Sequence, residues 1–220
     1  MARKVRIGAL ASGGGTNLQA IIDACQNGSL DAEIALVFTN NPEAGALKRA
    51  RKAGIACSVL DHREFQSRED FDRAVVQTLQ DAGVELVILA GFMRLISEVF
   101  LDAFPGRIMN IHPALLPAFP GLHVQRKALE YGARFAGCTV HFVDKGVDTG
   151  PIIIQAVVPV LDDDTEESLS ARILVQEHRV YPRAIQLFAE GRLQIEGRRV
   201  RISPPLTPAE ASLANPPLDA

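Results

Sequence analysis

The sequence has few cysteines, no excess of positive charge and no long apolar stretch. Its three cysteines, Cys25, Cys57 and Cys138, lie far apart and form no CxxC pair, so we predict neither a zinc site nor a disulfide framework, and a reducing compartment is favoured. The formal net charge of −3 argues against broad nucleic-acid binding but allows a local basic pocket for a phosphorylated substrate. The basic N-terminus leads directly into a strand pattern, so we expect no signal peptide, no membrane span and a cytoplasmic protein.

The first half of the chain alternates regularly between strand and helix patterns. Buried-strand patterns occupy 4–11, 32–39, 55–60 and 85–90, and helical patterns occupy 18–26, 44–52 and 68–81. This alternation predicts right-handed βαβ units, and therefore an α/β fold with a mostly parallel, twisted sheet flanked by helices. The length of 220 residues suits one α/β domain of this kind.

The second half predicts an antiparallel extension of that sheet. A helix is expected at 124–131, two strands at 137–143 and 152–160, a long helix at 168–189 and a short hairpin at 193–202. The two strands can pair antiparallel around the loop that joins them. We expect one domain over residues 1–202 and a loose tail, rich in Pro and Ala, over 203–220.

A glycine-rich turn separates the first predicted strand from the first helix. Gly13, Gly14 and Gly15 are followed by Thr16 and Asn17, which open the helix. Unpaired N–H groups and the helix dipole face such a turn, so it predicts an anion site. The triplet is neither a GxGxxG fingerprint nor a P-loop, and the alternative is that the glycines only allow a tight turn.

A proline-rich segment, 109–121, follows a short strand pattern at 107–109. Pro113 favours an extended conformation for His112, and Asn110 lies two residues before it, so their side chains should point the same way. We place both residues just past the carboxyl end of the strand, where open α/β sheets bind ligands. This polar pair is our candidate reaction centre.

The loop 144–148 offers a carboxylate to this pair. A carboxylate beside an imidazole favours the charged form, which can donate a proton or stabilise an oxyanion, with Asn110 as a second donor. Two alternatives stay open: His112 is structural, or Asp144 and Asp148 only form a turn. The chain has no GxSxG elbow or Cys–His pair, and its histidines lack metal-ligand spacing. The residues therefore predict acid–base or oxyanion-assisted group transfer without a metal or a covalent acyl-enzyme.

Four motifs, in order along the chain, closely resemble the phosphoribosylglycinamide formyltransferase family of folate-dependent enzymes. They occupy 12–21, 91–94, 110–117 and 148–151, within a match that runs from Val5 to Arg192. The resemblance implies a Rossmann-like formyltransferase fold. It also implies transfer of the formyl group of 10-formyltetrahydrofolate to the amine of glycinamide ribonucleotide in purine biosynthesis, by direct attack of the amine.

The resemblance also implies roles for individual residues. The implied catalytic residues are Asn110, His112 and Asp148. The implied ribonucleotide-binding residues are Gly15, Thr16 and Asn17 at the phosphate and Glu177 at the glycinamide end. The implied folate-binding residues are Arg68, Met93, Arg94, Leu95, Ile96 and Asn110. Ala114 and Gln125 differ from many relatives, which have Ser and His there, but neither belongs to the implied catalytic group.

Competing interpretations come from the same motifs. A formyltetrahydrofolate deformylase normally adds an N-terminal regulatory domain, whereas the strand pattern here begins at Lys4; a methionyl-tRNA formyltransferase normally adds a C-terminal tRNA-binding domain. A non-catalytic domain that senses folate or nucleotide would not need Asn110, His112 and Asp148 together. We expect small-molecule substrates, no nucleic-acid or membrane partner, and a monomer or homodimer.

Overall fold

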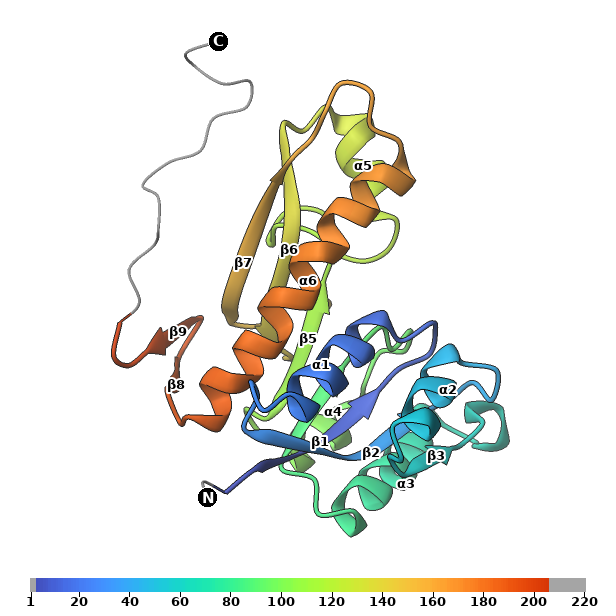
Figure 1. The fold of residues 1–220 in the computed structure, drawn as a ribbon. Coiled ribbons are helices and arrows are strands. Elements are labelled where there is room, and N and C mark those ends of the chain that lie inside the picture. The colour runs from blue at the N-terminus through green and yellow to red at the C-terminus, as the bar shows by residue number, and fades with distance from the viewer. Residues whose placement is uncertain (1–2, 206–220) are drawn as a thin grey trace.

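A single nine-stranded sheet runs through residues 3–205, the part of the chain that the computed structural model describes (Figure 1). Its strands follow the order β3-β2-β1-β4-β5-β6-β7-β9-β8. The parallel strands are β1 (Val5–Leu10), β2 (Ala32–Thr39), β3 (Cys57–Val59), β4 (Leu86–Leu89) and β5 (Ile108–His112). β4 is buried along its whole length, as expected of a strand covered on both faces. The predicted parallel α/β sheet is confirmed.

The remaining strands form the antiparallel extension that the sequence predicts. They are β6 (Phe135–Phe142), β7 (Ile152–Pro159), β8 (Leu193–Glu196) and β9 (Arg199–Ile202). β6 pairs antiparallel with both β5 and β7, and β8 pairs antiparallel with β9. The β8–β9 hairpin joins the sheet through a parallel contact between Ile152 and Arg199.

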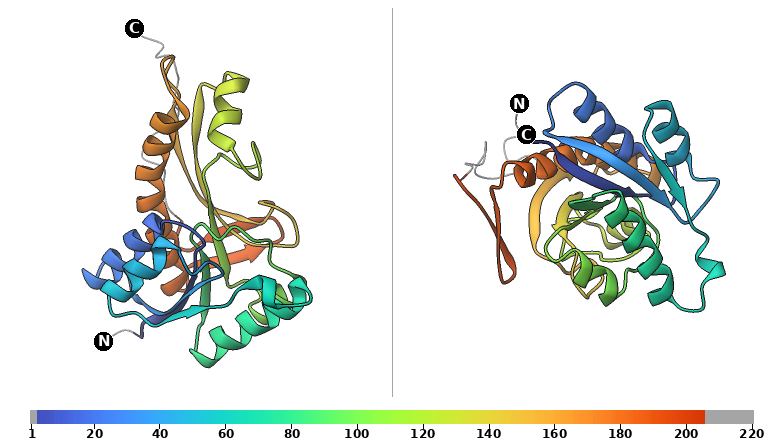
Figure 2. Two further views of the ribbon diagram at one scale, coloured as in Figure 1. Left: turned by 90° about the vertical axis from the view of Figure 1, so that its right-hand side faces the viewer. Right: turned by 90° about the horizontal axis from the view of Figure 1, so that it is seen from below.

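Helices cover both faces of the parallel half (Figure 2). The helices are α1 (Thr16–Gln26), α2 (Gly45–Lys52), α3 (Arg68–Asp81), α4 (Glu98–Ala103), α5 (Val124–Tyr131) and α6 (Glu166–Ala189), with a 3₁₀ turn at His62–Glu64. Apolar residues of α1, α2 and α6 share one buried cluster with the sheet, and those of α3 and α4 share a second. The helical spacing of Phe71, Val75 and Leu79 along α3 produces such a buried face.

The long helix α6 lies along β6 and β7 and reaches the parallel strands (Figure 1). The fully buried Tyr181 places its hydroxyl 3.1 Å from the Leu89 carbonyl oxygen and 3.0 Å from that of Met109. These carbonyls belong to β4 and β5, so the helix is fixed against the middle of the sheet. Glu177 lies one helical turn before Tyr181 and is thereby held beside the carboxyl ends of these strands.

The predicted position of Asn110 and His112 relative to their strand was wrong. Asn110 and His112 lie within β5, rather than just past its end. The reason is the antiparallel partner β6, whose register pairs Asn110 with His141 and His112 with Thr139 and so extends the ladder. Pro113 cannot donate to that ladder, and the strand ends before it. The expectation that both side chains share one face holds, because they remain two residues apart in extended chain.

Other differences are small and have local causes. α6 begins at Glu166, two residues before the predicted start, because Thr165 and Ser168 form a reciprocal capping box. The short helix α4 was not predicted. Of the predicted tail, the carbonyls of Ser203 and Pro204 accept hydrogen bonds from Arg192, while 206–220 lie outside the described residues. The domain boundary at 202 therefore stays a prediction.

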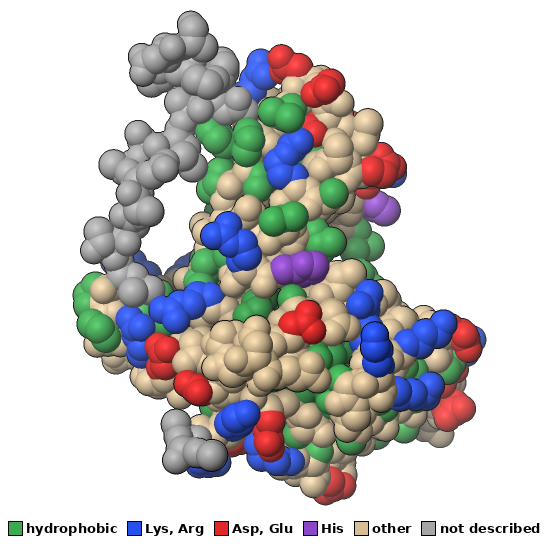
Figure 3. All heavy atoms as spheres, viewed as in Figure 1, with side chains coloured by type: hydrophobic (Ala, Val, Ile, Leu, Met, Phe, Trp, Pro, Cys, Tyr) green, Lys and Arg blue, Asp and Glu red, His purple; other side chains and the backbone are tan. Residues whose placement is uncertain are grey.

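Charged side chains of both signs are interspersed on the face drawn in Figure 3, and several of the basic ones lie over α2. This helix carries Arg49, Arg51 and Lys52 in its last turn. Within residues 3–205, no helix is long and apolar enough to cross a membrane.

Candidate active site

A cleft of about 1010 Å³ opens at the carboxyl ends of β4 and β5. The strand order reverses direction between β1 and β4, and open α/β sheets bind ligands at such a switch point. The predicted site residues that line the cleft are Asn17, Arg68, Met93, Arg94, Leu95, Ile96, Asn110, His112, Asp148 and Glu177. The fold thus gathers residues from both ends of the chain into one space.

The glycine-rich turn lies at the edge of this cleft. Gly15 has φ +72°, and a Cβ there would lie 2.8 Å from the Ala46 Cα, so this position requires glycine. Gly15 precedes α1 and provides no side-chain cap, which leaves first-turn N–H groups without a side-chain acceptor. Gly15 and Thr16 do not line the cleft, and Thr16 instead lines a cavity of about 530 Å³ between α1 and α6.

Asn17 and Glu177 connect the glycine-rich turn to the cleft. The Asn17 amide donates to the Glu177 carboxylate at 2.7 Å, across 160 residues of sequence. Glu177 is buried, and burial raises the pKa of its carboxyl although the hydrogen bond from Asn17 acts in the opposite direction. Within the described part of the chain, the buried Oδ1 of Asn17 has no hydrogen-bond partner, which makes it a candidate acceptor for a ligand.

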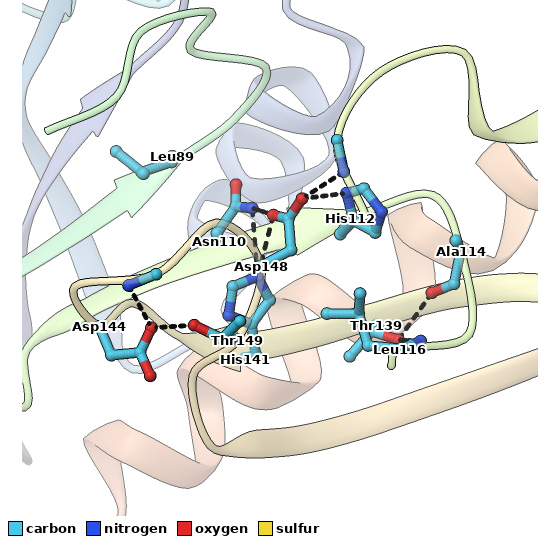
Figure 4. A network of polar contacts seen from close by, with 12 residues as sticks. Leu89, Asn110, His112, Ala114, Leu116, Thr139, His141, Asp144, Asp148 and Thr149 are labelled. Carbon is cyan, nitrogen blue, oxygen red and sulfur yellow. Dashed lines mark hydrogen bonds and ion pairs between the residues drawn. The ribbon is translucent and has the colours of Figure 1, made fainter. Parts of the chain in front are cut away.

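Asp148 stands at the centre of the polar network in Figure 4. Its Oδ2 lies 3.4 Å from His112 Nδ1 and accepts a hydrogen bond from the Gly121 amide at 2.9 Å. Its Oδ1 accepts from Asn110 Nδ2 at 3.4 Å and lies 3.7 Å from His141 Nε2. The loop 144–148 therefore does bring a carboxylate to Asn110 and His112.

Asp148 is held as a carboxylate by these neighbours. Burial acts to raise the pKa of its carboxyl, but hydrogen bonding, including that from the Gly121 amide, and the charge of His112 together lower that pKa below its ordinary value. The backbone of Asp148 has φ +55°, a conformation that Asp tolerates better than most residues and that turns its side chain into the cleft.

The imidazole of His112 is buried and has an oxygen acceptor at each nitrogen. Nε2 lies 2.9 Å from the Phe119 carbonyl oxygen, and Nδ1 faces Asp148. Only the imidazolium has an N–H donor at both positions, so only that form can donate to both acceptors. His112 is therefore no isolated structural histidine, because it contacts the one carboxylate that also binds Asn110.

His141 belongs to this network and was not predicted. Its Nδ1 lies 2.8 Å from the Phe142 carbonyl oxygen, which places the proton there and leaves Nε2 to accept from Asn110 Nδ2 at 3.2 Å. A signal was present, because Thr139 and His141 show the same two-residue spacing as Asn110 and His112. Only the register between β5 and β6 makes the two pairs face each other.

The turn-forming alternative is correct for Asp144 and wrong for Asp148. Asp144 Oδ1 accepts hydrogen bonds from the Gly146 amide at 3.1 Å and the Thr149 hydroxyl at 2.6 Å. Both partners lie within the loop, so Asp144 shapes the turn that presents Asp148 (Figure 4).

The proline-rich segment is fixed to the sheet by a buried hydroxyl. Thr139 donates to the Ala114 carbonyl at 2.7 Å and accepts from the Leu116 amide at 3.1 Å. Gln155 donates to both the Leu116 carbonyl and the Thr139 hydroxyl. Only the backbone of Ala114 takes part, so the network does not use its side chain.

The loop after β4 forms another wall of the cleft. Met93 and Leu95 are 70% and 58% exposed, so they offer apolar surface to a ligand. The guanidinium of Arg94 lies over the Phe71 ring at 5.0 Å, and the buried Asp72 accepts from the Ser97 amide at 2.6 Å. Residues 3–205 contain no group of three or more His, Cys, Asp or Glu side chains arranged to hold a metal ion.

These features place the chain in a known class: it belongs to the formyl transferase family, whose sequence model matches residues 5–185. It is 47% identical over 186 residues to the phosphoribosylglycinamide formyltransferase of Escherichia coli K12, a match that covers 84% of this chain and 88% of that protein. It is also similar to the crystal structure of glycinamide ribonucleotide transformylase 1 from Symbiobacterium toebii. That similarity has a TM-score of 0.90 and 58% identity, and it covers 92% of this chain and 95% of the other.

A larger relative contains a region similar to this chain. The chain is 50% identical over 191 residues to the trifunctional purine biosynthetic protein adenosine-3 of Drosophila melanogaster. The match covers 86% of this chain but spans only 14% of the length of that protein.

Proposed function

We propose that this chain transfers the formyl group of 10-formyltetrahydrofolate to the amine of glycinamide ribonucleotide, a step of purine biosynthesis. The observation that carries the proposal is the convergence of Asn110, His112 and Asp148 in one cleft, beside the Asn17–Glu177 pair. The names of the similar proteins from Escherichia coli and Symbiobacterium toebii supply the ribonucleotide and the formyl transfer. The formyl-folate donor is what the sequence resemblance implies.

The ribonucleotide phosphate is assigned to the turn formed by Gly15, Thr16 and Asn17. Support comes from the first-turn N–H groups of α1, which have no side-chain cap, and from the dipole of this helix. Arg49 donates to the Gly14 carbonyl at 2.8 Å and so brings a positive charge to the turn. Glu177 then accepts a hydrogen bond from the glycinamide end of the substrate. The hydrogen bond that it accepts from Asn17 orients its carboxyl group for this contact.

The folate is assigned to the other side of the cleft. Met93, Arg94, Leu95 and Ile96 follow β4 and combine exposed apolar side chains with backbone groups, which suits a flat heterocycle with donors and acceptors at its edge. Arg68 lines the same wall and is half exposed, with a 3.4 Å contact to Glu69. It suits the acidic part of the folate.

The proposed chemistry needs no enzyme nucleophile. The amine nitrogen of the ribonucleotide attacks the formyl carbon, and the carbonyl electron pair moves to oxygen. As the oxyanion collapses, the bond from carbon to N10 of the folate breaks, the amine nitrogen gives up a proton and N10 gains one. The oxyanion accepts hydrogen bonds from the His112 imidazolium and from Asn110, while Asp148 balances the imidazolium charge.

For the oxyanion to accept these hydrogen bonds, one contact of His112 and one contact of Asn110 in the structure must be replaced by contacts with the substrate. His112 Nε2 is engaged by the Phe119 carbonyl, and both N–H groups of Asn110 are engaged by His141 and Asp148. Of the two contacts that the Asn110 amide makes, the one to Asp148 is the longer, at 3.4 Å. We therefore assign the Asn110 N–H that faces Asp148 to the oxyanion.

The test compares formyl loss with product formation. The protein is incubated with 10-formyltetrahydrofolate, with and without glycinamide ribonucleotide, while tetrahydrofolate and formylated ribonucleotide are quantified. We expect equal amounts of both products and negligible formyl loss without the ribonucleotide. Formyl loss that does not depend on the ribonucleotide would point to a deformylase, and no turnover at all would favour a sensing domain.

The cellular compartment of this reaction is inferred from the cysteines. Cys25, Cys57 and Cys138 are all free thiols, which fits a reducing compartment such as the cytoplasm. Small molecules are the only partners that the proposal requires, and the choice between monomer and homodimer stays a prediction.

A further inference from the structure

Ser12 lies where three loops of the sheet meet, and it is not among the residues that line the cleft. It follows β1, directly before the glycine-rich turn. Its hydroxyl donates to Asn40 Oδ1 at 2.7 Å, in the loop after β2. The same hydroxyl accepts from the Met93 amide at 3.0 Å, in the loop after β4.

The backbone of Ser12 contacts the same two loops. Its amide donates to the Gly91 carbonyl at 3.0 Å, and its carbonyl accepts from Asn41 Nδ2 at 3.3 Å. β1 and β4 are neighbours that end in register, with Leu10 paired to Leu89, so their loops leave the sheet side by side. Ser12 therefore links the turn assigned to the ribonucleotide with the loop assigned to the folate.

The folate-side loop is held unevenly by its side chains. Phe92 and Ile96 pack against the core and Arg94 lies over the Phe71 ring, so the exposed positions between them depend most on backbone links. Met93 and Leu95 are largely exposed, so burial of apolar surface holds them only weakly. A backbone hydrogen bond to the Ser12 hydroxyl fixes Met93 without using any group that faces the cleft. Because ordering one loop lowers the cost of ordering a loop hydrogen-bonded to it, the geometry provides a route for coupling.

We propose that Ser12 is a positioning residue that couples the two substrate sites. A phosphate bound at the glycine-rich turn fixes Ser12, Ser12 fixes the Met93 amide, and the folate then meets a loop already ordered for it. The coupling is reciprocal, so folate also strengthens ribonucleotide binding by the same factor. This inference rests on the proposed function, because it needs both substrates to bind this cleft.

Calorimetric titration of tetrahydrofolate, with and without saturating glycinamide ribonucleotide, measures the coupling. In the wild type we expect the ribonucleotide to lower the Kd of tetrahydrofolate about 10-fold, within the usual range for coupled sites. In Ser12→Ala the factor should fall below about 2-fold, because the link to Met93 is lost. Ser29→Ala is the matched control, since within residues 3–205 the Ser29 hydroxyl makes a single hydrogen bond, to the Ala24 carbonyl at 3.3 Å.

A second measurement uses the wild type alone and so does not depend on how a variant folds. Ribonucleotide without folate should slow hydrogen exchange at the Met93 amide, even though that amide belongs to the folate side. Unchanged exchange there, or an undiminished coupling factor in Ser12→Ala, overturns the proposal and leaves the proposed function intact. A wild-type chain that binds neither ligand contradicts the proposed function itself, and the coupling with it.

Discussion

Asp148 and His112 lie side by side in the cleft, with Oδ2 of the carboxylate 3.4 Å from Nδ1 of the imidazole. The carboxylate is fixed by the Gly121 amide, and the imidazole is fixed at its other nitrogen by the Phe119 carbonyl. Neither ring nitrogen is left facing solvent. From this relationship we propose a definite task for Asp148, which is to hold His112 in the charged form that can donate hydrogen bonds.

Replacing Asp148 by Asn should therefore damage turnover more than binding. The imidazolium fraction of His112 falls, and kcat should drop about 100-fold or more, the usual range for losing a positioned acid or base. The KM of each substrate should change much less, because the lost stabilisation grows only as charge develops on the formyl oxygen. Steady-state kinetics at saturating substrates measures both.

Asp144→Asn is the matched control for this change. It removes the other carboxylate of the same loop, one whose partners Gly146 and Thr149 lie within the turn. We expect kcat to stay within a few-fold of the wild type, since an amide oxygen can still accept these hydrogen bonds. A comparable loss of kcat in both variants would mean that loop shape, and not the Asp148 charge, limits the reaction.

The glycine-rich turn calls for two different substitutions. At Gly14 a Cβ meets no atom within 4 Å, so Gly14→Ala should fold normally while crowding the amides assigned to phosphate. The KM for the ribonucleotide should rise about 10-fold, equivalent to about 1.4 kcal/mol of binding, with little change for the folate. If the KM for both substrates rises equally, the turn supports the fold and does not hold one ligand.

Gly15→Ala should act on the fold instead. The new Cβ would lie 2.8 Å from the Ala46 Cα, at a residue with φ +72°. The left-handed conformation alone costs an alanine about 1 kcal/mol, and the backbone contact adds to this. Urea unfolding should show lower stability for Gly15→Ala than for Gly14→Ala, and equal stability would contradict the close packing of Gly15 on α2.

Glu177 should make the stability of the protein depend on pH. Burial raises the pKa of its carboxyl above the ordinary value of 4.5, so the folded state keeps this proton longer than the unfolded state does. The wild type therefore loses stability as the pH rises from the unfolded pKa through the folded one. Glu177→Gln avoids this loss and keeps an acceptor for Asn17.

Unfolding by urea at several pH values tests whether the stability of the wild type falls as the pH rises. Glu177→Gln should be more stable than the wild type near pH 8 and close to it near pH 4, where the wild-type carboxyl is mostly protonated in both states. The same variant should bind the ribonucleotide more weakly. A gain in stability that is largest at low pH would contradict the assignment of a raised pKa.

Much of the fold follows from local pattern. The bounds of β2, α3 and α5 are those that the sequence indicates, because alternation, helical spacing and terminal glycines such as Gly83 and Gly132 are local signals. The end of β5 was wrong because it depends on its antiparallel partner β6. Strand pairing at a distance leaves no mark in a short window of sequence.

The candidate site, like the fold, could be predicted from the sequence where it depends on local pattern. Asn110 and His112 could be paired because extended chain has a period of two residues. Local pattern could not choose between Asp144 and Asp148, and only the family resemblance named Asp148, since the choice depends on the path of the loop and the positive φ of Asp148. His141 was missed for a related reason, because its contact with Asn110 exists only through the β5–β6 register.

The most direct test of the central claim is the protonation of His112, read from the ¹⁵N chemical shifts of its ring near neutral pH. We expect both nitrogens of His112 to carry protons in the wild type and one of them to lose its proton in Asp148→Asn. A neutral His112 in the wild type, or an imidazolium that persists in Asp148→Asn, would contradict the role given to Asp148.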